Sequence, residues 1–142
     1  MTDISPRPTP SWFTIAAIGV LLWELIGCAM YLMQVSVDPA LLPVDERAVW
    51  EAAPAWMTAA YGVAVWGGLV GAFLLLMRRS LSAPVLLVSF IAVLVQFSAL
   101  IVVPSLRELL TSDMLLLPFL IAVICFLIWR FAHYAKVNGW LR

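Results

Sequence analysis

The longest apolar stretch of the chain carries a single charged residue near its middle. It runs from Ser11 to Val35, SWFTIAAIGVLLWELIGCAMYLMQV, and its one Asp, Glu, Lys or Arg is Glu24. A helix of about 25 residues rises roughly 37 Å, which is enough to cross a hydrocarbon core ~30 Å thick with some tilt. A carboxyl group at that depth is costly in contact with lipid. The stretch therefore predicts a membrane-spanning helix with Glu24 facing protein or water.

Three further apolar stretches have the length needed to span a membrane. Hydrophobic residues make up 65% of the 142 residues, whereas about 45–50% is usual in a soluble domain. The connections between the stretches are short and leave no length for a folded soluble domain. The sequence predicts a single all-α integral membrane domain over residues 1–142, a four-helix bundle with antiparallel neighbours. The expected spans are about 11–35, 55–77, 83–103 and 114–135.

Lysine and arginine are distributed unequally between the two ends of this bundle. Two of them, Arg47 and Arg107, fall in the connections at one end, and six fall at the other end. Positive residues favour the cytoplasmic side. We therefore expect both termini and the basic loop 78–82 in the cytoplasm, with the protein in the inner (plasma) membrane of a bacterial cell. The six residues are Arg7, Arg78, Arg79, Arg130, Lys136 and Arg142.

The two polar segments outside the basic loop differ in character. The acidic loop 36–54 contains VDERAVWEA, whose helical periodicity is typical of an amphipathic helix on the bilayer surface. A flexible loop is the alternative, and the sequence leaves both open. The first ten residues, MTDISPRPTP, include three prolines and predict a short extended tail.

Small residues recur at every fourth position in the span 55–77. Ala60, Ala64 and Gly68 lie on one stripe of the helix, with Gly67 and Gly71 beside it. Small side chains allow two membrane helices to approach closely and pack by van der Waals contact. We expect this face to pack inside the monomer, and the alternative is a homodimer interface.

Glu24 and Gln96 are expected at similar depth. Each lies about 12 or 13 residues from the cytoplasmic end of its span, which corresponds to roughly 18–20 Å. The helical face of Glu24 also carries Cys28 and Tyr31. We therefore expect this face to meet the Gln96 face inside the bundle.

The expected pair of Glu24 and Gln96 has two interpretations. One is a structural latch, in which a neutral carboxyl group is hydrogen-bonded to the amide because burial disfavours charge. The other is a mid-membrane site for a solute or a proton, because an ionisable residue inside a membrane is a functional-site hypothesis by default. The candidate ligand or proton site consists of Glu24, Gln96, Tyr31 and Cys28.

Basic residues at the cytoplasmic end are candidates for contact with lipid headgroups. Arg130 and His133 lie about one turn apart near the end of the last span, and Arg78 with Arg79 forms the basic loop. Long cationic side chains near helix ends reach toward the interface. A defined contact with a lipid phosphate is the more specific hypothesis.

Several classes of chemistry lack their residues in this chain. The sequence contains no HExxH, CxxC, GxSxG or P-loop pattern. Cys28 and Cys125 both fall inside apolar stretches, which favours buried thiols over a disulfide or a metal site. A formal net charge of zero offers no footprint for nucleic acid. We predict no enzyme activity, no metal and no cofactor; the expected partners are the lipid bilayer and either a second copy or another membrane protein.

Three segments carry a resemblance to a known group of proteins. They are WELIG in the first span, the acidic segment VDERAVWEAAP, and PAWMTAAYGVAVWGGLVGAFLLLMRRS. Together they resemble small four-helix bacterial inner-membrane proteins labelled "sugar transporter", near the DoxX-like superfamily. The resemblance covers most of the chain and brings no catalytic motif. It implies a small-solute carrier or carrier component, with sugars as the candidate class. The alternative is a non-transporting accessory protein that assembles a membrane complex.

Overall fold

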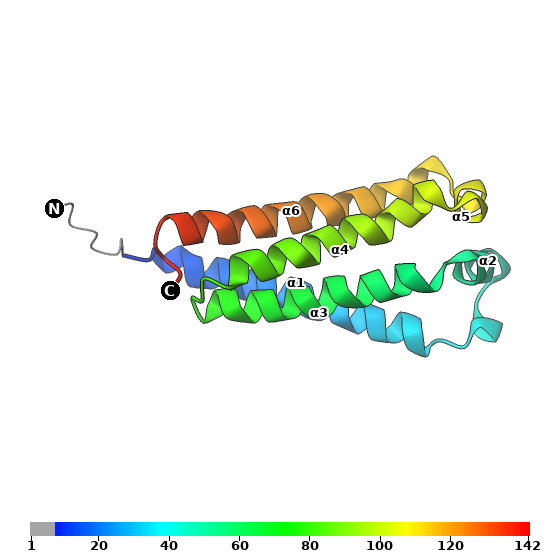
Figure 1. The fold of residues 1–142 in the computed structure, drawn as a ribbon. Helices are drawn as coiled ribbons and strands as arrows, with labels where there is room; N and C mark the ends of the chain where they lie inside the picture. The colour runs from blue at the N-terminus through cyan, green and yellow to red at the C-terminus, as the bar shows by residue number, and fades with distance from the viewer. Residues whose placement is uncertain (1–7) are drawn as a thin grey trace.

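Four long helices lie side by side in the computed structural model, which describes residues 8–142 (Figure 1). They are α1 (Ser11–Ser36), α3 (Ala55–Leu76), α4 (Ser82–Val102) and α6 (Leu116–Val137). Each of the four is part of a helical segment that is long and apolar enough to cross a membrane. The prediction of an all-α fold with four helices of membrane-spanning length is confirmed for this part of the chain. The predicted tail falls mainly on residues 1–7, which lie outside the described part.

Prolines mark where the long helices begin. Pro10 and Pro54 immediately precede α1 and α3, while Pro84 and Pro118 are the third residues of α4 and α6. Proline has no backbone N–H and a fixed φ near the helical value, so it is tolerated in the first turn and not in the helix interior. The four prolines thus define the helix starts without interrupting any span.

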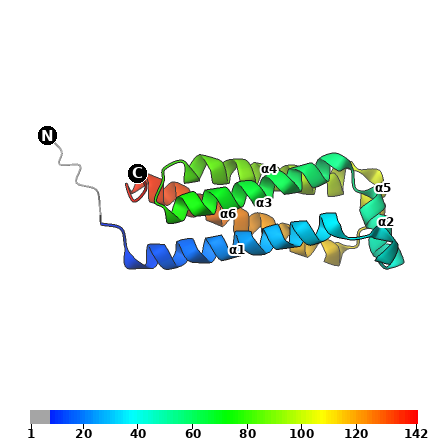
Figure 2. The same cartoon turned by 90° about the horizontal axis from the view of Figure 1, so that it is seen from below.

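The connections at the end away from the termini fold into short helices. The acidic loop contains η1 (Pro39–Leu41) and α2 (Val44–Ala52), and the second connection contains α5 (Pro104–Leu109) and η2 (Ser112–Leu115). Helix α2 packs against α5 across this end of the bundle (Figure 2). Of the two expectations for the acidic loop, the helix is the one observed.

Arg47 holds the acidic loop together. Its Nε donates a hydrogen bond to the carbonyl of Pro39 at 2.7 Å, and its Nη2 donates to the carbonyl of Ala40 at 2.6 Å. The Pro39 carbonyl also accepts from Leu42 N at 3.2 Å, so Arg47 adds charge-assisted bonds to the end of η1. The one base among the four acidic residues of this loop therefore joins η1 to α2.

The long helices pack in the order α1, α3, α4, α6. Helix α3 contacts both α1 and α4, and α6 packs on α4. Rings join α1 to α6 at the end near the termini: Trp12 and Phe13 lie 5.9 Å and 5.5 Å from Phe131 between centroids. Trp140 packs on both α1 rings, at 5.7 Å and 6.0 Å. The seam between α1 and α6 is closed there by aromatic side chains.

The main hydrophobic core occupies the same end of the bundle. It includes Phe13, Leu75 and Leu86, together with Trp140 and Leu141 from the C-terminal segment. That segment continues across the α3–α4 turn. Arg142 N donates to the carbonyl of Arg78, Ser80 N donates to the carbonyl of Arg142, both at 2.6 Å, and Arg78 has a left-handed φ of 57°. Apolar packing and this backbone pairing close the end near the termini.

The small-residue face of α3 is used inside the monomer. Ala60, Ala64, Gly68 and Gly71 are buried, and Gly67 is partly buried. A Cβ atom placed on Gly71 would lie 2.6 Å from Cγ of Leu86, so α4 approaches the backbone of α3 at this point. The absence of a side chain permits the close packing of these two helices.

Candidate functional site

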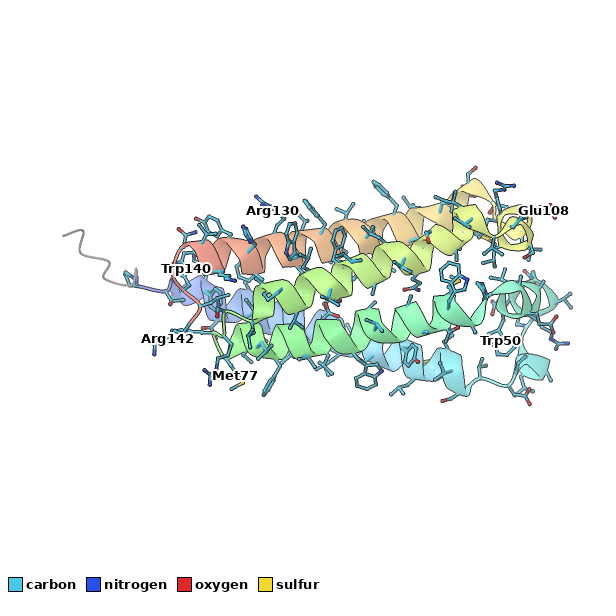
Figure 3. The ribbon with its side chains drawn as sticks, viewed as in Figure 1. Trp50, Met77, Glu108, Arg130, Trp140 and Arg142 are labelled. Carbon is cyan, nitrogen blue, oxygen red and sulfur yellow. The ribbon has the colours of Figure 1, made fainter. Side chains whose placement is uncertain are left out.

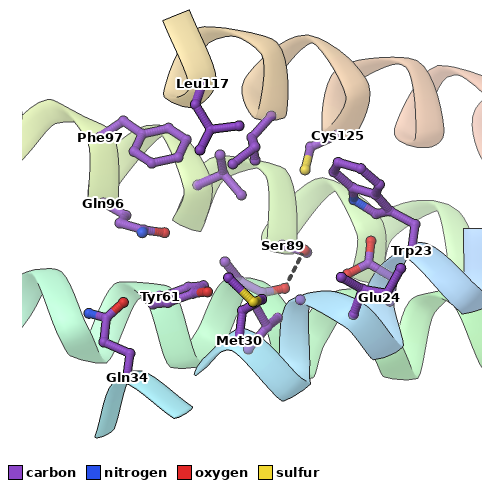
Figure 4. A pocket seen from close by; sticks show the side chains of 16 residues that line it. Trp23, Glu24, Met30, Gln34, Tyr61, Ser89, Gln96, Phe97, Leu117 and Cys125 are labelled. Atoms are coloured by element: carbon purple, nitrogen blue, oxygen red, sulfur yellow. Dashed lines mark hydrogen bonds between the residues drawn. The ribbon is translucent and has the colours of Figure 1, made fainter. Parts of the chain in front are cut away.

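A cavity of about 340 Å³ lies among the four long helices (Figure 4). Its volume falls within the range of about 300–1,000 Å³ that is common for small-molecule sites. Most of the lining side chains are apolar or aromatic. The polar ones are Glu24 and Gln34 from α1, Tyr61 from α3, and Ser89 and Gln96 from α4.

Glu24 is buried beside this cavity without a protein partner. Its side chain is 6% exposed, and its carboxyl group lies so close to Gly68 that a Cβ atom on residue 68 would overlap it. Within residues 8–142, no hydrogen bond or ion pair engages the carboxyl group. No fully buried side-chain oxygen in this part of the chain lacks a hydrogen-bond partner, so the unpaired carboxyl oxygens border the cavity and are not sealed from it. The cavity is therefore the place from which a partner can reach it.

Gln96 is the second buried polar group of the cavity. It is 9% exposed, and its amide has no hydrogen-bond partner in the described part of the chain. Ser89 differs, because its Oγ donates to the carbonyl of Ala64 at 2.6 Å. The cavity thus contains one satisfied hydroxyl group and two buried groups whose hydrogen-bonding capacity is unused.

The expected contact between Glu24 and Gln96 is not formed. Figure 4 places them at opposite ends of the cavity, with Ser89 between them. The depths differ because α4 begins deeper in the bundle than α1. Ser82, the first residue of α4, donates to the carbonyl of Gly71 at 3.0 Å. Helix α1, in contrast, begins at the level of the α3–α4 turn, where the Arg78 guanidinium lies 6.0 Å from the Phe13 ring centroid.

Cys28 and Tyr31 face α3 and do not line the cavity. The Cys28 thiol donates to the carbonyl of Val65 at 3.4 Å, and the Tyr31 ring packs edge-on against Tyr61 with centroids 5.2 Å apart. Glu24 lies on the same face of α1 as Cys28 and Tyr31, and of the three only Glu24 lines the cavity. Of the four residues in the candidate ligand or proton site, the structure brings Glu24 and Gln96 to the cavity and assigns Cys28 and Tyr31 to helix packing.

The structure also adds residues that sequence reasoning did not place in a site. Trp23, Gln34, Tyr61 and Cys125 all border the cavity (Figure 4). Gln34 could have been found from the sequence, because a polar amide inside the first apolar stretch is a candidate for a buried polar site. Cys125 could not have been found from the sequence, because a cysteine in an apolar stretch is most often an ordinary residue of a packed core. Within residues 8–142, no three His, Cys, Asp or Glu side chains come close enough to hold a metal ion.

The basic residues of the headgroup hypothesis lie away from the cavity. Arg78, Arg79, Arg130 and His133 are all exposed. Figure 3 shows Arg130 projecting outward from α6, in the half of the bundle nearer Trp140 and Arg142. Their contact with lipid phosphates stays a prediction, and none of them lines the cavity.

Fold and site together define a class of protein: an all-helical chain with four candidate membrane spans around an internal cavity that holds a buried carboxyl group. Comparison with protein-family models, with curated proteins and with solved structures found no match. The resemblance to the group labelled "sugar transporter" therefore stays an expectation.

Proposed function

We propose that the protein binds a small molecule in the cavity among α1, α3, α4 and α6, as a membrane carrier or as a component of one. The observation that supports this most is the pair of buried groups without a partner in residues 8–142, Glu24 at 6% exposure and Gln96 at 9%. Leaving a buried polar group unpaired costs about 1–3 kcal/mol. Two such groups beside one cavity are typical of a binding site, whose ligand supplies the missing hydrogen bonds.

The same observation argues against Glu24 as a structural latch. A latch stabilises a fold by pairing two buried polar groups with good geometry. The carboxyl group of Glu24 has no such partner among the described residues. Polar positions in the bundle that do serve packing are satisfied: Ser82 and Ser89 each donate to a carbonyl of α3.

For orientation, we propose that both termini lie in the cytoplasm of a bacterial cell and that α2 and α5 lie outside. Arg78, Arg79 and Lys136 belong to the end where the termini lie, whereas Arg47 and Arg107 belong to the opposite end. This distribution is the one that the positive-inside rule favours. Arg7, which counts toward the same side, lies outside the described residues.

An accessory protein that assembles a membrane complex is the second candidate. It is favoured by the seam between α1 and α6, where α1 meets its neighbour through aromatic rings near the termini and leaves the rest of that side open to another helix. Four helices are few for a carrier, so a second copy or another membrane protein fits either candidate. Under the accessory reading, Glu24 contributes nothing to assembly.

The first test asks whether the Glu24 carboxyl group exchanges protons with water through the cavity. Infrared difference spectra of the protein in liposomes are recorded across pH 5 to 9, with Glu24→Gln as the blank. We expect a carboxyl band that is absent from the variant and changes with pH or on transfer to D₂O. A Glu24 carboxyl band that changes neither with pH nor on transfer to D₂O would show that water does not reach the carboxyl group. This result would contradict the carrier proposal.

The second test measures transport itself. Proteoliposomes are screened with a panel of labelled small solutes that includes sugars, using wild-type protein and Glu24→Gln. We expect uptake of the cognate solute to be lost in Glu24→Gln while the variant still folds and inserts. A solute that both proteins transport equally would refute the role assigned to Glu24.

A further inference from the structure

The mouth of the cavity lies on the side of the bundle, between α1 and α6. Ile26 and Met30 of α1 and Leu117 of α6 line the cavity and are nevertheless 61%, 56% and 63% exposed. In a bilayer, an exposed apolar side chain on a spanning helix faces lipid or a neighbouring helix. The cavity therefore opens sideways into the hydrocarbon region.

Both ends of the bundle are covered more completely than this side. The main hydrophobic core and the aromatic rings of α1 and α6 fill the end near the termini. Helices α2 and α5 pack across the opposite end. For a molecule dissolved in the bilayer, the seam between α1 and α6 is the lateral route into the cavity.

We infer that the ligand is an uncharged lipophilic alcohol that enters from the bilayer between α1 and α6. Its hydroxyl group donates a hydrogen bond to the Glu24 carboxyl group. The inference rests on the proposed binding function and names its ligand class. Glu24 lies near the middle of the 26-residue α1, which corresponds to mid-membrane depth for a helix that spans a bilayer. A charged headgroup brought to that depth would lose its hydration at high cost, whereas a single hydroxyl group loses little and regains a hydrogen bond.

The remaining lining matches the rest of such a molecule. The walls between the polar residues are apolar or aromatic, as with Trp23, Val93 and Phe97. Gln96 lies at the opposite end of the cavity from Glu24 (Figure 4) and offers a donor or acceptor to a second polar group. An apolar body lying along the helices thus contacts hydrocarbon-like walls, and its hydroxyl group lies at the Glu24 end.

Photocrosslinking of the full-length protein in phosphatidylcholine liposomes tests this inference. The probe is dodecanol carrying a diazirine in its chain, and the matched control probe is its methyl ether, which has no hydroxyl donor. We expect labelling at Ile26, Met30 and Leu117 that unlabelled dodecanol competes away. The ether should label about fivefold less, as expected for the loss of one buried hydrogen bond.

Variants separate binding in the cavity from general contact with lipid. Leu117→Trp narrows the mouth, and Leu120→Trp is its control because Leu120 is 50% exposed on the same helix and does not line the cavity. Labelling by the alcohol should fall about fivefold or more in Leu117→Trp and in Glu24→Met, and stay unchanged in Leu120→Trp. Glu24→Gln keeps an acceptor oxygen and should still bind the alcohol, so most of the labelling is retained; the uptake that this variant is expected to lose requires, in addition, a carboxyl group that exchanges a proton.

Two results would overturn the inference in different ways. Labelling that is equal for alcohol and ether, and unaffected by Leu117→Trp, would identify the probe as an adventitious additive only. Glu24-dependent uptake of a sugar or another hydrophilic solute, with no specific labelling by the alcohol, would refute the ligand class and leave the proposed binding function intact. Failure of both the uptake screen and the infrared test would remove the binding function as well.

Discussion

The carboxyl group of Glu24 occupies the space that a side chain on residue 68 would need. A Cβ atom built on Gly68 overlaps the carboxyl group, whereas one built on the adjacent Gly67 meets Cβ of Ser89 at 3.6 Å, an ordinary contact. The buried acid of α1 therefore depends on one glycine of α3 for its position. The overlapping atoms are the end of a flexible side chain, so a larger residue at position 68 would turn the carboxyl group away from α3.

Gly68→Ala is expected to destabilise the protein and to displace Glu24 toward the cavity. Forcing an extra methyl group into a packed site typically costs about 1–3 kcal/mol, and the low end of this range applies here because the overlapping carboxyl group ends a flexible side chain. Gly67→Ala is the matched control, with a change in the free energy of unfolding of less than about 1 kcal/mol. Unfolding in mixed detergent measures both. Equal behaviour of the two alanine variants would contradict the contact between Glu24 and Gly68.

Glu24→Met is expected to leave the free energy of unfolding unchanged or to raise it by about 1–2 kcal/mol. Methionine has a similar length, and the substitution removes a buried polar group that has no partner in the described part of the protein. The measurement is again unfolding in mixed detergent, in the absence of added ligand. A loss of about 2 kcal/mol or more would show that Glu24 has a stabilising partner and would restore the latch interpretation.

Ser89→Ala is expected to lower the free energy of unfolding by about 0.5–1.5 kcal/mol. Its hydroxyl group makes a buried hydrogen bond of 2.6 Å to the Ala64 carbonyl, which joins α4 to α3. Ser98 provides the control on the same helix, since its hydroxyl group bonds only the carbonyl of Val95 within α4 at an exposed position. Ser98→Ala should therefore change stability by less than half as much as Ser89→Ala.

The proposed orientation predicts opposite accessibility for the two ends of the bundle. Arg79 and Glu108 are both exposed, at the α3–α4 turn and in α5 respectively. A membrane-impermeant thiol reagent added to intact cells should label Glu108→Cys and not Arg79→Cys. Lysis should make both reactive. The reverse pattern in intact cells would place the termini outside.

Much of the fold could be predicted because its causes are local in the sequence. The length of each apolar stretch, the prolines at the helix starts and the periodicity of VDERAVWEA each act over one or a few helical turns. The observed helices Ser11–Ser36 and Ala55–Leu76 accordingly lie close to the predicted spans 11–35 and 55–77. The burial of Glu24 followed in the same way, from the cost of a carboxyl group in lipid.

The site was predicted only in part, because depth along one helix does not fix depth relative to another. Counting from the span ends put Glu24 and Gln96 at one level, but the α3–α4 turn starts α4 beside Gly71, deeper than the start of α1. The rotation of α1 then assigned Cys28 and Tyr31 to packing against α3 and brought Trp23 and Gln34 to the cavity.

The sequence by itself determined that this is an all-helical chain with four membrane-length spans and a buried acid, because hydrophobic length and the cost of burying charge are properties of single segments. Only the tertiary structure decided that the acid has no partner among residues 8–142, that it lies against Gly68, and that exposed residues of α1 and α6 line its cavity. Those features depend on the axial offset and rotation of packed helices, and these are set by side-chain contacts between segments far apart in the chain.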